Sequence, residues 1–136
     1  MKIVLSYILS SVYLLFFGLI LLIFHPVQML FKWIGGYPLR KKSVDVLNFL
    51  ILYGFTILGS RIRLNGFNQV PKNRPLIIVS NHQNTFDIPP IVWGFRKHHP
   101  KFVSKIELAK GIPSISYNLR HGGSALIDRK NPRQSI

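Results

Sequence analysis

Apolar and charged residues divide the chain into an apolar N-terminal segment and a mixed remainder. No Asp, Glu, Lys or Arg occurs from Ile3 to Phe31, and 22 of these 29 residues are Val, Ile, Leu, Met, Phe or Tyr. A helix over Ile3–Phe24 would be about 33 Å long, enough to cross a hydrocarbon core of about 30 Å. We expect it to end at His25–Pro26, because Pro disfavours helical geometry in the preceding residue. Residues 1–31 are therefore predicted to be a transmembrane or membrane-inserted anchor.

A cleaved signal peptide is the alternative for this first segment. The single Lys2 would suit its charged start, but the apolar run is too long and no A-x-A cleavage site follows. A second apolar run, Val46–Gly59, is short for a membrane span. We expect it to be an interfacial helix or the shallow return of a helical hairpin, within a connecting region over residues 32–70.

From Val70 onward, short apolar runs alternate with segments that have helix signals. The strands predicted here are 76–79, 102–104 and 124–127, and the helices are 87–96 and 114–120, with a helical turn at 107–110. Strand, helix, strand, helix, strand predicts an α/β fold with a mostly parallel sheet over residues 71–136.

Charge narrows the choice of partner. The chain carries 18 Lys and Arg against 4 Asp and Glu, for a net charge of +14, which suits nucleic acid or an anionic membrane surface. We find no zinc-ligand spacing, RNP-like aromatic motif or basic heptad helix, so we expect no nucleic-acid partner. Lys32 and Arg40–Lys42 follow the anchor while only Lys2 precedes it, which places the C-terminal side in the cytoplasm. The chain has no Cys, which excludes a disulfide, a thiolate metal site and a cysteine nucleophile.

The strongest candidate for chemistry is the segment from Asn81 to Asp87. His82 and Asp87 are five residues apart, so they would not share a face of one helix. They can meet if His82 ends the strand 76–79 and Asp87 caps the next helix. The carboxylate would then hold one ring nitrogen as N–H and leave the other to accept a proton from a hydroxyl. The alternative is an exposed His beside an N-cap Asp with no chemistry.

The segment 81–87 resembles the N-H-x-x-x-x-D motif of the glycerolipid acyltransferases, and most closely that of the bacterial 1-acyl-glycerol-3-phosphate acyltransferases. Asn84 stands where many members have Ser. A second block, 123–129, resembles the family's G-x-x-F-I-D-R motif, with Leu126 in place of Phe. Between them, 105–108 and 112–113 are similar to the family's K-x-E-L…P stretch.

This resemblance implies acyl transfer from an acyl thioester, either acyl-CoA or acyl carrier protein, to the sn-2 hydroxyl of lysophosphatidic acid. The product would be phosphatidic acid, made at the bacterial inner membrane with the catalytic part facing the cytoplasm. His82 would be the general base and Asp87 would orient it, with no metal and no cofactor. The residues implied in substrate binding are Arg129 for the phosphate, Lys105 for the thioester oxyanion, Asn81 and Gly123.

The family pattern continues with an E-G-T-R motif and a fourth apolar motif, and neither occurs in these 136 residues. We therefore expect an N-terminal part of an acyltransferase domain that is inactive or weak by itself. Two alternatives stay open. One is a related acyltransferase acting on another lyso-lipid or on glycerol phosphate, and the other is an inactive membrane-anchored remnant that binds anionic lipid.

Overall fold

A computed structural model describes residues 2–72 and 74–131; the parts of the predicted segments 1–31 and 71–136 at residues 1, 73 and 132–136 lie outside it. The longer elements are α1 (Lys2–Gly54), α2 (Ile88–Gly94), α3 (Ile115–His121), β1 (Val103–Lys105) and β2 (Ala125–Ile127). Short 3₁₀ helices lie at Phe55–Leu58, Phe67–Gln69, Thr85–Asp87, Arg96–His98 and Ile106–Ala109.

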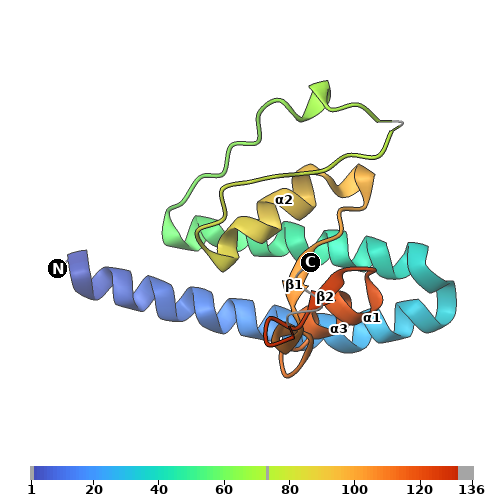
Figure 1. Cartoon of the computed structure of the whole chain (residues 1–136). Coiled ribbons are helices and arrows are strands. Elements are labelled where there is room, and N and C mark those ends of the chain that lie inside the picture. The colour runs from blue at the N-terminus through green and yellow to red at the C-terminus, as the bar shows by residue number, and fades with distance from the viewer. Residues whose placement is uncertain (1, 73, 132–136) are drawn as a thin grey trace.

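Helix α1 is a hairpin of two antiparallel arms, as Figure 1 shows in blue and teal. The chain reverses at Gly36, whose φ of 62° and ψ of −150° suit a residue without a side chain. The predicted return of a hairpin is confirmed, and the predicted helix end at His25–Pro26 is wrong. Pro26 is exposed and removes one backbone donor. The helix continues past it because His25 and the buried Gln28 are hydrogen-bonded to Ser114 and Asn118.

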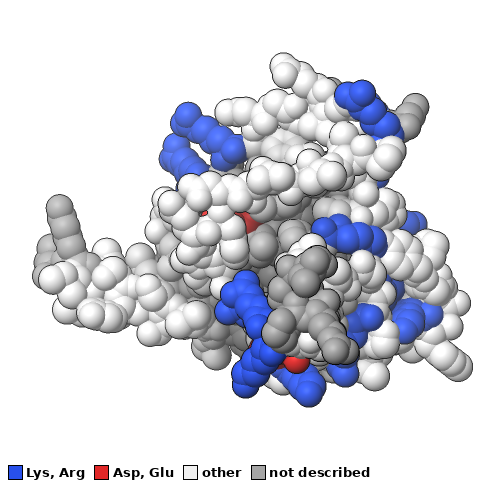
Figure 2. All heavy atoms as spheres, in the orientation of Figure 1, with Lys and Arg blue, Asp and Glu red and all other residues white. Residues whose placement is uncertain are grey.

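The two arms enclose an apolar core. Tyr13, Ile20 and Leu21 of the first arm pack with Leu47, Ile51 and Phe55 from the second arm and the turn after it. Many other apolar side chains of the first arm are exposed, and Figure 2 shows no charged side chain on the described residues of its projecting N-terminal part. One helical segment, Ile3–Leu58, is long and apolar enough to cross a membrane, and most of its most apolar stretch is not buried within the protein.

Polar side chains attach α3 to the hairpin. The buried Ser114 Oγ donates to the Leu21 carbonyl at 2.9 Å, and the Ser114 amide donates to His25 Nδ1 at 3.1 Å. Asn118 receives a hydrogen bond from the buried Arg40 at 2.7 Å and donates one to the buried Gln28 at 2.9 Å. Polar residues of both arms, His25 and Gln28 before Gly36 and Arg40 after it, therefore hold the C-terminal part of the chain to the hairpin.

The sheet in the described residues has two strands. β1 and β2 are parallel, with Val103 opposite Ala125 and Lys105 opposite Ile127, so the parallel pairing predicted here is confirmed. The predicted strand 76–79 is wrong: it forms no ladder, and Ile77 and Val79 are 94% and 89% exposed. A β-branched run favours extended backbone, but a strand forms only when a distant segment pairs with it.

Substitution of Asn118 by Ala should destabilise the protein, because it leaves the buried Arg40 guanidinium and the buried Gln28 carbonyl without this partner. We expect a loss of about 2–3 kcal/mol, measured by thermal unfolding in detergent. The matched control is Gln69→Ala, which removes an exposed amide. Equal melting temperatures for the two variants would contradict the docking role of Asn118.

Candidate active site

The segment before α2 folds into a capped turn. Asn84 is the N-cap of the 3₁₀ helix Thr85–Asp87, and its side-chain oxygen accepts the Phe86 amide at 3.2 Å. Asp87 completes a capping box, because its Oδ2 accepts the amides of Gln83 and Asn84, both at 2.8 Å. Asn and Asp are the residues that favour such local side-chain bonds to the backbone. The loop therefore has its own hydrogen bonds, independent of a sheet.

His82 and Asp87 meet in this loop, as the spacing predicted. His82 Nδ1 lies 3.3 Å from Asp87 Oδ2, and the two side chains are 54% and 38% exposed. The route differs from the one expected. Among the described residues before His82 there is no strand, and Asp87 is the last residue of the 3₁₀ helix Thr85–Asp87. With Nδ1 toward the carboxylate, Nε2 lies on the opposite edge of the ring, where a proton acceptor for a substrate hydroxyl would be.

The electrostatics of Asp87 follow from the same contacts. The amides of Asn84 and Gln83 are the main reasons that its pKa is lowered, with a smaller contribution from His82. The carboxylate is therefore ionised throughout the neutral range. It can both fix the orientation of the imidazole and stabilise an imidazolium that forms during proton transfer.

Phe86 anchors this loop to the hairpin, which the sequence analysis missed. Its ring lies edge-on to Tyr13 and Phe55 at centroid distances of 5.6 and 5.5 Å, and to Phe17 at 6.3 Å. Edge-to-face pairs at such distances are favourable beyond the area that they bury. The sequence does show that the hairpin is rich in aromatic residues. It does not show that these residues contact Phe86, because they are far from it in the chain.

The other predicted site residues lie on separate elements. Lys105 is the last residue of β1 and pairs with Ile127, the last residue of β2. Arg129 lies two residues after Ile127, so both cations are at the carboxyl edge of the sheet. Gly123 has a φ of 82° in the turn before β2. Asn81 is exposed in the extended segment before His82. Among the described residues, no hydrogen bond or ion pair joins Lys105 or Arg129 to His82 or Asp87.

An apolar groove lies between the second arm of α1, the segment 60–64 and Trp93 of α2. It has a volume of about 510 Å³ and is lined by Phe49, Leu52, Tyr53, Thr56, Ser60, Arg61, Ile62, Arg63, Leu64 and Trp93. Trp93 is six residues after Asp87, about 9 Å along a helix axis. Among the described residues, no group of three or more His, Asp or Glu side chains could hold a metal ion.

Comparison with known proteins gives one positive finding. The family model described as Acyltransferase matches residues 61–136, which include the capped loop, both strands and α3. No curated protein and no solved structure matches the chain significantly.

Asp87 should titrate at unusually low pH. Since its folded pKa is lowered, the stabilisation that its carboxylate gives the loop is complete at neutral pH and is lost as the pH falls through that lowered pKa. NMR titration of the Gln83 and Asn84 amides in detergent should give a midpoint below 3.8, the ordinary Asp value. The midpoint should disappear in Asp87→Asn, and a midpoint at or above 3.8 in the unchanged protein would contradict the geometry.

Proposed function

Because the chain belongs to the acyltransferase family, we propose that it transfers an acyl group from an acyl thioester to the sn-2 hydroxyl of 1-acyl-glycerol-3-phosphate. The observation that carries this proposal is the His82–Asp87 contact of 3.3 Å inside the matched region. A neutral imidazole oriented by a carboxylate can activate a hydroxyl, and acyl transfer to a lipid hydroxyl needs that step. The product would be phosphatidic acid.

In the proposed reaction, His82 Nε2 accepts the proton of the acceptor hydroxyl as its oxygen attacks the thioester carbonyl carbon. Collapse of the tetrahedral intermediate breaks the carbon–sulfur bond, and the imidazolium returns the proton to the leaving thiolate. Asp87 stabilises the imidazolium, as its hydrogen bonds to Gln83 and Asn84 hold it beside the ring. No cofactor takes part, and the donor is acyl-CoA or acyl carrier protein.

Substrate binding in this proposal uses the cations at the sheet edge. The Arg129 guanidinium suits bidentate contact with the acceptor phosphate, and Lys105, at the same edge, would stabilise the oxyanion. Asn81 and Gly123 would line the approach. The apolar groove beside Trp93, with Arg61 and Arg63 among its lining residues, offers a surface for an acyl chain.

Membrane association belongs to the same proposal. Exposed apolar side chains continue along the first arm, including Leu15 and Leu22, which are 65% and 58% exposed. Such a surface is favourable in lipid and costly in water. Because α3 covers part of the hairpin through Ser114 and Asn118, we infer that the hairpin enters one leaflet while its other face carries the catalytic residues. We propose the cytoplasmic face of a bacterial inner membrane, following the Lys and Arg residues near the turn.

Replacement of His82 by Ala should lower kcat for acyl transfer about 100-fold or more, because the general base is lost. The assay is thiol release from acyl-CoA with lysophosphatidic acid and the chain in detergent. Gln83→Ala is the control, since it keeps the backbone amide that Asp87 accepts. Equal turnover by the two variants would refute the role of His82. Turnover only with another lyso-lipid or glycerol phosphate would change the assigned acceptor, and lipid binding without any turnover would favour the inactive remnant.

A double substitution, Leu15→Lys with Leu22→Lys, should release the protein from neutral phosphatidylcholine vesicles in a flotation assay. Each Lys in an apolar layer costs about 2–3 kcal/mol, so the partition should fall well over tenfold. Ile77→Lys is the control, because Ile77 is 94% exposed and lies outside the hairpin. Unchanged flotation of the double variant would exclude the hairpin as the membrane contact.

A further inference from the structure

A group of side chains surrounds the turn of the hairpin, away from the proposed catalytic pair. We define this turn cluster by five residues, which are Lys32, Tyr37, Arg40, Lys101 and His121. The first three come from α1, Lys101 lies just before β1, and His121 ends α3. Phe86 rests on Phe17, and Lys32 is 15 residues further along the arm, about 22 Å. The cluster is thus separate from His82.

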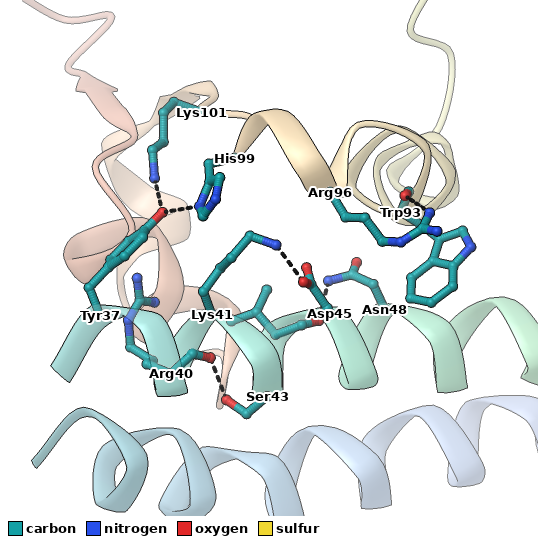
Figure 3. Close-up of polar contacts among 11 residues, drawn as sticks. Tyr37, Arg40, Lys41, Ser43, Asp45, Asn48, Trp93, Arg96, His99 and Lys101 are labelled. Carbon is teal, nitrogen blue, oxygen red and sulfur yellow. Dashed lines mark hydrogen bonds and ion pairs between the residues drawn. The ribbon is translucent and has the colours of Figure 1, made fainter. Parts of the chain in front are cut away.

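Tyr37 contacts two cations of the cluster, Arg40 and Lys101, which Figure 3 shows beside it. Lys101 Nζ donates to Tyr37 Oη at 2.6 Å and lies 4.7 Å from the centre of its ring. The Arg40 guanidinium carbon lies 5.1 Å from the same ring. The aromatic ring therefore has two cations against it, and Lys101 also donates to the Gly122 carbonyl at 2.5 Å. These contacts fix the positions of the cations.

The cluster gathers positive charge with little to neutralise it. Lys32 Nζ lies 3.0 Å from His121 Nδ1, and partial burial, then Lys32 and other nearby cations, lower the pKa of His121. His99, stacked on Tyr37, also has a lowered pKa, through burial and the cations Lys41 and Lys101. The carboxylate of Asp45 acts in the opposite direction on the pKa of His99, but it already forms an ion pair with Lys41. A bound anion would offset this repulsion.

The apolar neighbours of the cluster indicate what kind of anion fits. Trp33 and Ile34, next to Lys32 at the turn, are 84% and 62% exposed. Trp favours the boundary between headgroups and hydrocarbon, where one end of the side chain is apolar and the other is wet. A ligand that satisfies both surfaces at once has a phosphate and an acyl chain.

We propose that the turn cluster binds the phosphate of an anionic phospholipid headgroup, with Lys32, Lys101 and His121 around the phosphate and Trp33 and Ile34 in the adjoining apolar layer. The buried Arg40 contributes charge from below the Tyr37 ring. This inference rests on the proposed membrane association of the hairpin and is independent of the catalytic pair. It gives the protein a second phosphate site, about 22 Å along the first arm from Phe17, on which the loop with His82 rests.

The test uses Trp33 as its own reporter. The chain has two Trp residues, so the background substitution Trp93→Phe leaves Trp33 as the source of indole emission. The full chain in zwitterionic detergent is titrated with dioctanoyl-phosphatidylglycerol, dioctanoyl-phosphatidylcholine and inorganic phosphate in separate arms. We expect a saturable emission shift with phosphatidylglycerol at a midpoint about tenfold or more below that for phosphatidylcholine.

Variants locate the binding site. Lys32→Gln and Lys101→Gln should each weaken phosphatidylglycerol binding about fivefold, the contribution of one cation near a lipid surface. Lys110→Gln is the matched control, because it removes the same charge from an exposed lysine outside the cluster. Lys101→Gln could unfold the turn before β2, because Lys101 donates to the Gly122 carbonyl of that turn. Lys32→Gln keeps the test decisive, because the exposed Lys32 contacts the side chain of His121 and makes no bond to that carbonyl.

Three results would overturn the proposal. Equal midpoints for phosphatidylglycerol and phosphatidylcholine would exclude recognition of charge. An effect of Lys110→Gln as large as that of Lys32→Gln would indicate diffuse attraction instead of a site. An equal response to inorganic phosphate alone would assign the cluster to a soluble ligand. Failure of the proposed membrane association gives a different result. The protein would then not float with neutral vesicles, while the ratio of the two lipid midpoints in detergent would stay the same.

Discussion

The packing of the two arms of α1 against each other is the constraint on which the remaining structure depends. Tyr13 of the first arm and Phe55, just past the end of the second, stack at a centroid distance of 5.5 Å. Phe86 then packs edge-on against both rings and brings the loop with His82 to the hairpin. An apolar segment that resembles a simple membrane anchor is thus also the platform for the candidate active site, and without it that loop would have no apolar support.

The hairpin has a polar surface that contacts α3 and an exposed apolar surface, and polar side chains such as His25 and Gln28 lie on the first of these. His25, Gln28 and Arg40 would be costly in lipid, but each binds α3 or the residue before it, at Ser114 or Asn118. The exposed surface of the first arm between Ile3 and Ile23 is mostly apolar and carries Leu, Ile, Val and Tyr side chains with a few Ser. The same helix therefore holds α3 through polar side chains and leaves apolar side chains exposed elsewhere along its first arm.

The family assignment and the local geometry support each other at different scales. The matched region 61–136 places the chain among acyltransferases, and the capped loop holds Asp87 next to His82 with hydrogen bonds from its own backbone. Lys105 and Arg129 share a sheet edge without touching that pair in the described part of the chain. The described part of the structure thus has a His–Asp pair, two cations at a sheet edge and cations around the hairpin turn as separate features.

Local chemistry was readable from the sequence alone. The uncharged run after Lys2, the β1 and β2 runs and the pairing of His82 with Asp87 depend on residue types and short spacings, which are local properties. Contacts between distant segments were not readable. The run 76–79 has every local preference for a strand but no partner among the described residues. Pro26 lies within a helix in which His25 and Gln28 are hydrogen-bonded to Ser114 and Asn118. Only the tertiary structure could decide these points, because strand pairing and helix docking gain their free energy from residues far away in the chain.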